Sequence, residues 1–150
     1  AVKRIRAARS AIDRAGGSVM LVGRAECFLV GRPDLTETVA RLQAYANAGA
    51  DCLYAPGVTT REQIVALVEA VAPKPLNLLV GSANDLTVAD IAALGVRRIS
   101  VGGALARSAW GGFMRSAQML AQRGRFDGFA DAASGKELNA LFSEPQVSPP

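Results

Sequence analysis

The sequence predicts an α/β fold built on a parallel β-sheet. Four short apolar runs, near residues 19, 52, 76 and 97, alternate with segments of helical periodicity, which is typical of repeated β/α units. The runs are continuously apolar, as expected of strands that are covered on both faces. Three connections repeat one pattern, in which a helix ends at a glycine just before the next strand. These observations fit either an open doubly wound sheet or a barrel, and 150 residues suit one domain.

The elements of the first third follow from periodicity and capping residues. Residues 2–15 place apolar side chains on one helical face and arginines on the others, and Gly16 ends this helix. Asp34, with Glu37 three residues later, has the form of a capping box that starts a second helix. The elements expected here are a helix over 2–15, a strand over 18–23, a helix over 34–48 and a strand over 51–55.

The same alternation continues to the end of the chain. Thr59 or Thr60 caps the next helix, and Thr87 opens a short helix that Gly95 ends. A long helix with Trp110 follows the last strand. The elements expected here are a helix over 60–71, a strand over 76–80, a helix over 87–94, a strand over 96–101, helices over 104–122 and 134–142, and a Pro-rich tail over 144–150 that we expect to be disordered.

Composition excludes several classes of function. The net charge is +4, but the basic residues are scattered and form no stripe with aromatic residues, so we expect no nucleic-acid partner. The sequence has no histidine, which excludes a Ser-His-Asp triad, and its two cysteines support neither a disulfide scaffold nor a zinc site. No apolar run approaches the roughly 18 residues of a membrane span, and no signal-peptide pattern is present. We therefore expect a cytoplasmic protein without a membrane partner.

Candidate functional residues follow the ends of the predicted strands. Ligands of parallel α/β folds bind at the carboxyl ends of the strands. Arg24 and Glu26 follow the first strand, and Asn77 and Ser100 lie on the third and fourth. Gly102 precedes the long helix, whose N-terminal N–H groups favour an anion. An arginine directly after five small or apolar residues is well placed to bind a carboxylate or a phosphate.

Several motifs resemble the isocitrate lyase/phosphoenolpyruvate mutase superfamily. They are "GRAE" at the end of the first strand, "RLQAY" and "AGAD" in and after the second helix, "PLN" at the third strand and "LGVRRISVGGAL" around the fourth. The resemblance covers about residues 1–130. It implies an eight-stranded TIM-type (β/α)8 barrel, of which residues 1–143 would form the C-terminal half within a single domain.

The resemblance implies a Mg²⁺-dependent lyase that acts on a small 2-oxo or 2-hydroxy carboxylate. The concrete reactions are cleavage of a C–C bond or decarboxylation of oxaloacetate, through a pyruvate enolate. There are two alternatives. One is a phosphonomutase-like enzyme that rearranges P–C bonds, and the other is a non-catalytic barrel that binds an oxo-acid. The resemblance also implies a homo-oligomer, either a tetramer or a dimer.

The resemblance also assigns roles to individual residues. Arg24 matches the arginine that grips the substrate carboxylate, and we expect it to be catalytic and substrate-binding. Glu26 either positions Arg24 or a metal-bound water, or forms a plain salt bridge. Asn77 lies near a polar position of the seventh barrel strand. Substrate-binding residues are therefore expected to be Arg24, Glu26, Asn77, Ser100 and Gly102.

The sequence departs from the family pattern in two ways. Many lyases of the family carry a glutamate at the end of the sixth barrel strand, where this chain reads Tyr54-Ala55-Pro56-Gly57 and has no carboxylate. This difference favours a phosphonomutase-like or oxaloacetate-decarboxylating branch. The family's metal carboxylates and its loop cysteine belong to the first barrel half, so we expect the Mg²⁺ ligands outside this segment. Cys27 and Cys52 are expected to be buried packing residues. The chain is therefore expected to be a piece of a longer protein, a dimerising half-barrel being the alternative.

Overall fold

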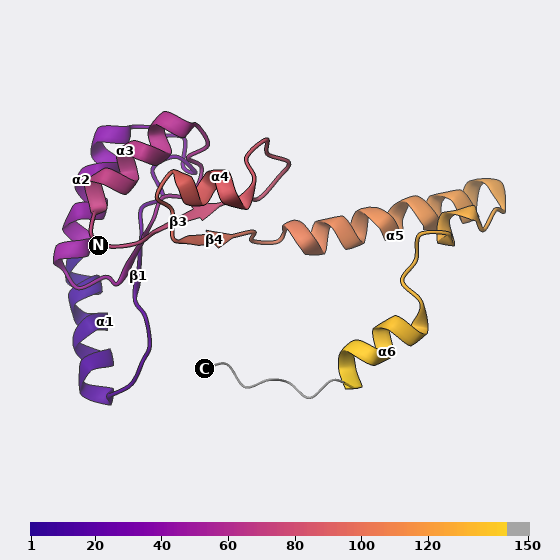
Figure 1. The fold of residues 1–150 in the computed structure, drawn as a ribbon, viewed down its shortest axis with the longest axis horizontal. Helices are drawn as coiled ribbons and strands as arrows, with labels where there is room; N and C mark the ends of the chain where they lie inside the picture. Colours follow the sequence, from indigo (N-terminus) through magenta and orange to yellow (C-terminus); the bar gives the residue numbers. More distant parts are fainter. Residues whose placement is uncertain (144–150) are drawn as a thin grey trace. The chain divides into compact units, whose positions relative to one another are not determined.

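The computed structural model describes residues 1–143 and divides into two compact units, residues 1–104 and residues 105 onward. The first unit alternates helices and strands in the expected order (Figure 1). Its elements are α1 (Val2–Ala15), β1 (Val22–Arg24), α2 (Leu35–Asn47), β2 (Cys52–Tyr54), α3 (Arg61–Val71), β3 (Leu76–Leu79), α4 (Val88–Ala93) and β4 (Arg98–Ser100). The strands form one parallel sheet in the order β1-β2-β3-β4.

The predicted helices begin where their caps place them. The Asp34 carboxylate accepts from the backbone N–H of Glu37 at 2.8 Å and starts α2. Thr60, rather than Thr59, caps α3 through the N–H of Gln63. Side-chain acceptors therefore satisfy N–H groups that a helix leaves unpaired at its start.

The sheet is shorter than the apolar runs suggested. The strand expected over 18–23 begins only at Val22, and Asp51 binds the preceding residue, Leu21, through its backbone N–H and its side chain. Its carboxylate accepts from the Leu21 N–H at 2.7 Å and from Arg9 Nη1 of α1 at 2.9 Å. At the other edge, the strand expected over 96–101 ends at Ser100. Val101 begins the turn into the next helix.

The core lies between the sheet and its helices. Leu53, Leu76 and Leu78 project from the strands into a cluster with residues of α2 and α3. Leu42 of α2 and Leu67 of α3 are almost wholly buried in that cluster. Cys27 and Cys52 are free and buried, as expected.

The second unit contains α5 (Ala104–Arg123), a 3₁₀ turn η1 (Asp127–Phe129) and α6 (Gly135–Ser143). The Ser116 hydroxyl of α5 donates to the carbonyl of Gly128 at 2.6 Å, which fixes the turn against this helix. Among the described residues, no helix is both long and apolar enough to cross a bilayer. The predicted tail at 144–150 lies outside the described residues, and a single domain over 1–143 stays a prediction.

Candidate functional site

A row of polar side chains crosses the sheet on the face opposite the helices. The strand register pairs Arg24 with Tyr54, Tyr54 with Asn77 and Asn77 with Arg98. Side chains of paired residues lie on the same face, and the face changes at each step along a strand. The neighbours Leu53, Leu76 and Leu78 therefore enter the helix-covered core, whereas the row faces the other side.

Arg24 is held by two neighbours at the end of β1. Its guanidinium forms a side-on ion pair with Glu26, in which Nε faces Oε1 and Nη2 lies 3.4 Å from Oε2. The Arg24 Cζ lies 4.9 Å from the centre of the Tyr54 ring, which is a cation–π contact. Glu26 therefore occupies one edge of the guanidinium, and the Tyr54 ring lies beneath its central carbon. The edge with Nη1 remains available for a bidentate carboxylate.

Asn77 joins β3 to β4 at the centre of the row. It is 1% exposed. Its Oδ1 accepts from Arg98 Nη1 at 2.7 Å, and its Nδ2 donates to the Ser100 hydroxyl at 2.9 Å. One donor and one acceptor of this amide are thus used within the sheet, and one of each remains.

Gly102 lies in the turn that follows β4. Its φ is +52°, a conformation that glycine adopts without strain, and the Ala104 N–H closes the turn on the Val101 carbonyl at 3.0 Å. A Cβ built on Gly102 would lie 3.6 Å from Leu79, an ordinary contact, so the backbone angle rather than crowding selects glycine.

A hollow of about 380 Å³ opens at the carboxyl ends of the strands. Leu79, which follows Asn77 by two residues on the same face, forms one wall. Leu29 of the loop after β1 and Val58 of the loop after β2 form another. The remaining wall is the loop after β3, where Ser82, Asn84 and Asp85 supply polar groups. The position matches the end of the sheet where parallel folds bind ligands.

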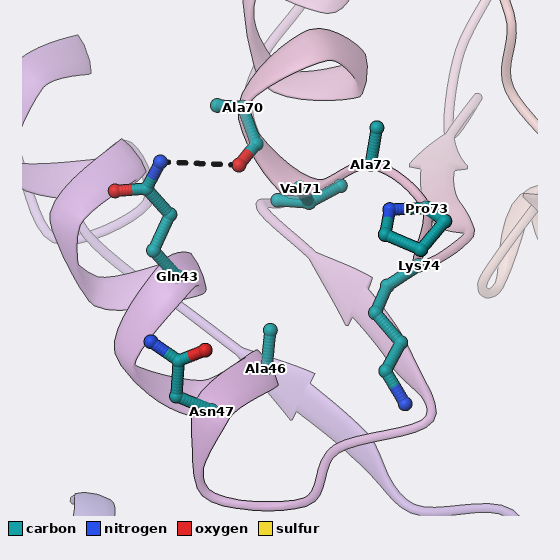
Figure 2. A pocket seen from close by; sticks show the side chains of 8 residues that line it. All are labelled: Gln43, Ala46, Asn47, Ala70, Val71, Ala72, Pro73 and Lys74. Carbon is teal, nitrogen blue, oxygen red and sulfur yellow. Dashed lines mark hydrogen bonds between the residues drawn. The ribbon is translucent and has the colours of Figure 1, made fainter.

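A second cavity, of about 350 Å³, lies between the C-terminal ends of α2 and α3. Figure 2 shows Gln43 reaching across from α2 to the Ala70 carbonyl of α3, a bond of 3.1 Å, with Lys74 on the opposite side. Lys74 precedes β3, so this cavity lies at the amino ends of the strands. Parallel sheets bind their ligands at the other end, and we do not place the chemistry here.

The described residues do not make a magnesium site of their own. No group of three or more acidic, cysteine or histidine side chains gathers anywhere within residues 1–143. The Glu26 carboxylate is engaged by Arg24. Because Mg²⁺ binds through carboxylates, substrate oxygens and water, one paired carboxylate is not a sufficient donor set.

The site combines expected residues with two that the sequence reasoning missed. Arg24 and Glu26 come together as expected, and Asn77 meets Ser100. Gly102 has no direct contact with these side chains among the interactions described. Neither Arg98 nor Tyr54 is among the residues predicted from the sequence to bind substrate. The signal for Arg98 was present, because it precedes Ser100 by two residues and therefore shares its face.

Known proteins decide between the open sheet and the barrel. A sequence model described as Phosphoenolpyruvate phosphomutase matches residues 1–121. The chain belongs to this family. A structure of 2,3-dimethylmalate lyase, a PEP mutase/isocitrate lyase superfamily member, matches this chain with a TM-score of 0.79 and 26% identity. The match covers 95% of this chain and 50% of that one. Half of a TIM-type barrel, the expected architecture, is thereby confirmed.

Two further solved structures resemble this chain. A candidate lyase/mutase from Burkholderia cenocepacia J2315 matches it with a TM-score of 0.90 and 44% identity, over 96% of this chain and 52% of that one. An oxaloacetate acetylhydrolase in complex with the inhibitor 3,3-difluorooxalacetate matches with a TM-score of 0.78 and 28% identity. The match covers 92% of this chain and 46% of that one. The chain thus spans about half the length of the structures it matches. The superfamily resemblance is confirmed, and its members are lyases and mutases.

Proposed function

We propose that the full-length protein is a Mg²⁺-dependent lyase of a small 2-oxo or 2-hydroxy carboxylate, with oxaloacetate as the first substrate to test. The single observation that carries this is Arg24, fixed at the carboxyl end of β1 with one guanidinium edge available. The likeness to an oxaloacetate acetylhydrolase and a dimethylmalate lyase, both enzymes of small carboxylates by name, supports the substrate class.

Arg24 would act in two ways on such a substrate. Two parallel hydrogen bonds from one edge of the guanidinium would fix the plane of the substrate carboxylate. When the C–C bond breaks, its electron pair moves into the neighbouring 2-oxo group and an enolate forms. A positive charge fixed beside that group stabilises the developing negative charge without having to reorient. The ligands of the implied Mg²⁺ are expected outside the described residues, and no step is assigned to it.

The test is turnover of oxaloacetate by variants of the full-length protein. Arg24→Ala should lose at least two orders of magnitude in kcat/KM, as expected when a preorganised charged donor is removed. Arg24→Lys should retain only part of the wild-type kcat/KM, because an ammonium group cannot replace the planar guanidinium, which forms two parallel hydrogen bonds. Arg32→Ala is the matched control, since its side chain is 68% exposed and lies 3.5 Å from Glu37. An Arg24→Ala enzyme with full activity would refute the site.

The alternatives predict different products. A phosphonomutase-like enzyme is favoured by the family match and by the absence of a carboxylate at residues 54–57, the strand end where many family lyases carry a glutamate. It would rearrange a P–C bond, and ³¹P NMR distinguishes a phosphonate from a phosphate ester directly. A non-catalytic barrel would be stabilised by an oxo-acid without turning it over.

We also propose a homo-oligomer, in which the second unit contacts another copy. The α5 helix buries none of its side chains fully, and Trp110 and Phe113 stack edge to face at 5.4 Å while remaining 63% and 61% exposed. Exposed apolar surface of this kind is typical of subunit interfaces. Phe113→Arg should lower the mass measured by light scattering if that contact is correct. The cytoplasmic location stays a prediction, which cell fractionation would test.

A further inference from the structure

We propose that Tyr54 is a positioning residue, whose ring holds the Arg24 guanidinium in place and so sets how a substrate carboxylate is held. The inference rests on the proposed function and adds a residue to it. The resemblance gives Tyr54 no role, since many family lyases carry a glutamate at this strand end, where the chain reads Tyr54-Ala55-Pro56-Gly57.

The sheet itself brings the two side chains together. Arg24 and Tyr54 are register partners in adjacent parallel strands, so their side chains leave the same face about 4.8 Å apart. The bond from the Ala25 N–H to the Tyr54 carbonyl, at 2.9 Å, continues the pairing one residue beyond β1. The contact is therefore built from the backbone of this chain alone.

The ring is the rigid member of the pair. Tyr54 is only 9% exposed and rotates about two side-chain bonds, whereas the Arg24 side chain is 46% exposed and rotates about four. An arginine with no support would lose considerable rotamer freedom on binding a ligand. A buried ring under one face removes part of that freedom beforehand, which is preorganisation of the binding group.

Tyr54 and Glu26 restrict different motions of the same group. The Arg24 Cζ lies over the Tyr54 ring, 4.9 Å from its centre, so the ring limits how far the guanidinium can move toward the sheet. Glu26 pairs with the Nε and Nη2 edge and limits rotation within the plane. Together they leave the Nη1 edge pointing in one direction. A glutamate in place of Tyr54 would instead compete with the substrate carboxylate for the positive charge.

The experiment measures binding of oxalate, a planar dianion resembling an enolate, to the full-length protein in buffer with MgCl₂ by titration calorimetry. Tyr54→Leu removes the ring, and we expect oxalate affinity to fall about 2- to 30-fold, the range of a cation–π contact. Tyr54→Phe keeps the ring and should bind within about twofold of the wild type. Tyr45→Leu is the matched control: Tyr45 is buried on the helix side of β1, and its loss should leave affinity unchanged.

The outcomes separate the inference from the proposed function. Wild-type affinity in a folded Tyr54→Leu protein would overturn the positioning role and leave the function standing. Equal losses in Tyr54→Phe and Tyr54→Leu would also overturn it, because the hydroxyl rather than the ring face would then be responsible. If the wild-type protein binds no oxalate, the proposed function fails and the inference with it. Weakened binding in Tyr54→Leu, with recovery in Tyr54→Phe, supports both.

Discussion

Gly23 lies at a close contact between β1 and α2, and Gly23→Ala tests that packing. A Cβ built on Gly23 would lie 2.9 Å from the Tyr45 Cβ, 3.1 Å from the Ala50 Cβ and 3.2 Å from a methyl of Leu53. Two of these three atoms are themselves Cβ atoms, which no side-chain rotation can move. The added methyl can therefore be accommodated only by shifting the helix or the strands.

The expected magnitude follows from two opposing terms. Replacing glycine where φ is not positive gains about 0.4–1 kcal/mol, because the unfolded chain loses freedom. Overpacking a close-packed core costs about 1–3 kcal/mol, and the immobile neighbours place this site near the upper end. The net loss of unfolding free energy should be about 2 kcal/mol, or roughly 4–8 °C in Tm for a domain of 150–250 residues.

Urea and thermal unfolding of the full-length protein, followed by circular dichroism, measure this loss. Gly81→Ala is the matched control, because its nearest neighbour would be Leu79 at 3.7 Å and its φ is not positive. That variant should change the unfolding free energy by less than about 0.5 kcal/mol. A Gly23→Ala protein as stable as the wild type would refute the close contact of α2 with β1.

Three further predictions concern other contacts. Asp51→Ala should cost about 1–3 kcal/mol in urea unfolding, because the Leu21 N–H loses its acceptor; a neutral result would contradict the anchoring role. The bonds from Thr87 lower the pKa of Asp90, so this carboxylate stabilises the fold above about pH 4, and the contribution disappears as pH falls through the lowered pKa. The unfolding free energy of Thr87→Ala should therefore fall less below about pH 4 than that of the wild type. Equal losses in the two proteins would contradict the cap. Burial raises the pKa of the Cys52 thiol, so a disulfide reagent should modify it only after unfolding, and rapid native labelling would be inconsistent with that burial.

The order of helices and strands could be predicted from the sequence because local rules determine it. Caps such as Asp34 and Thr87 satisfy N–H groups within three residues of themselves, so their effect is visible in a short stretch. Strand ends were less predictable. Val19 and Met20 look like strand residues but are about two-thirds exposed, since Asp51, thirty residues from Leu21 in sequence, holds that segment instead.

The site was predictable only where one strand carries the signal. Arg24 and Glu26 lie two residues apart, so the pleat alone places them on one face. The contacts of Tyr54 with Arg24 and of Arg98 with Asn77 depend on the register between strands. Register is set by how separate strands pack on the helices, and no short motif records it.

The alternation of faces along each strand separates two kinds of evolutionary change. Tyr54 and Asn77 can each be replaced without altering the apolar contacts of Leu53 and Leu76. These leucines are their neighbours in sequence but lie on the other side of the sheet. Substitutions in the polar row therefore change the site without changing the apolar contacts of the core. Deleting one residue from a strand would instead exchange the two faces at once. This family should accordingly tolerate substitution within its strands far better than insertion or deletion.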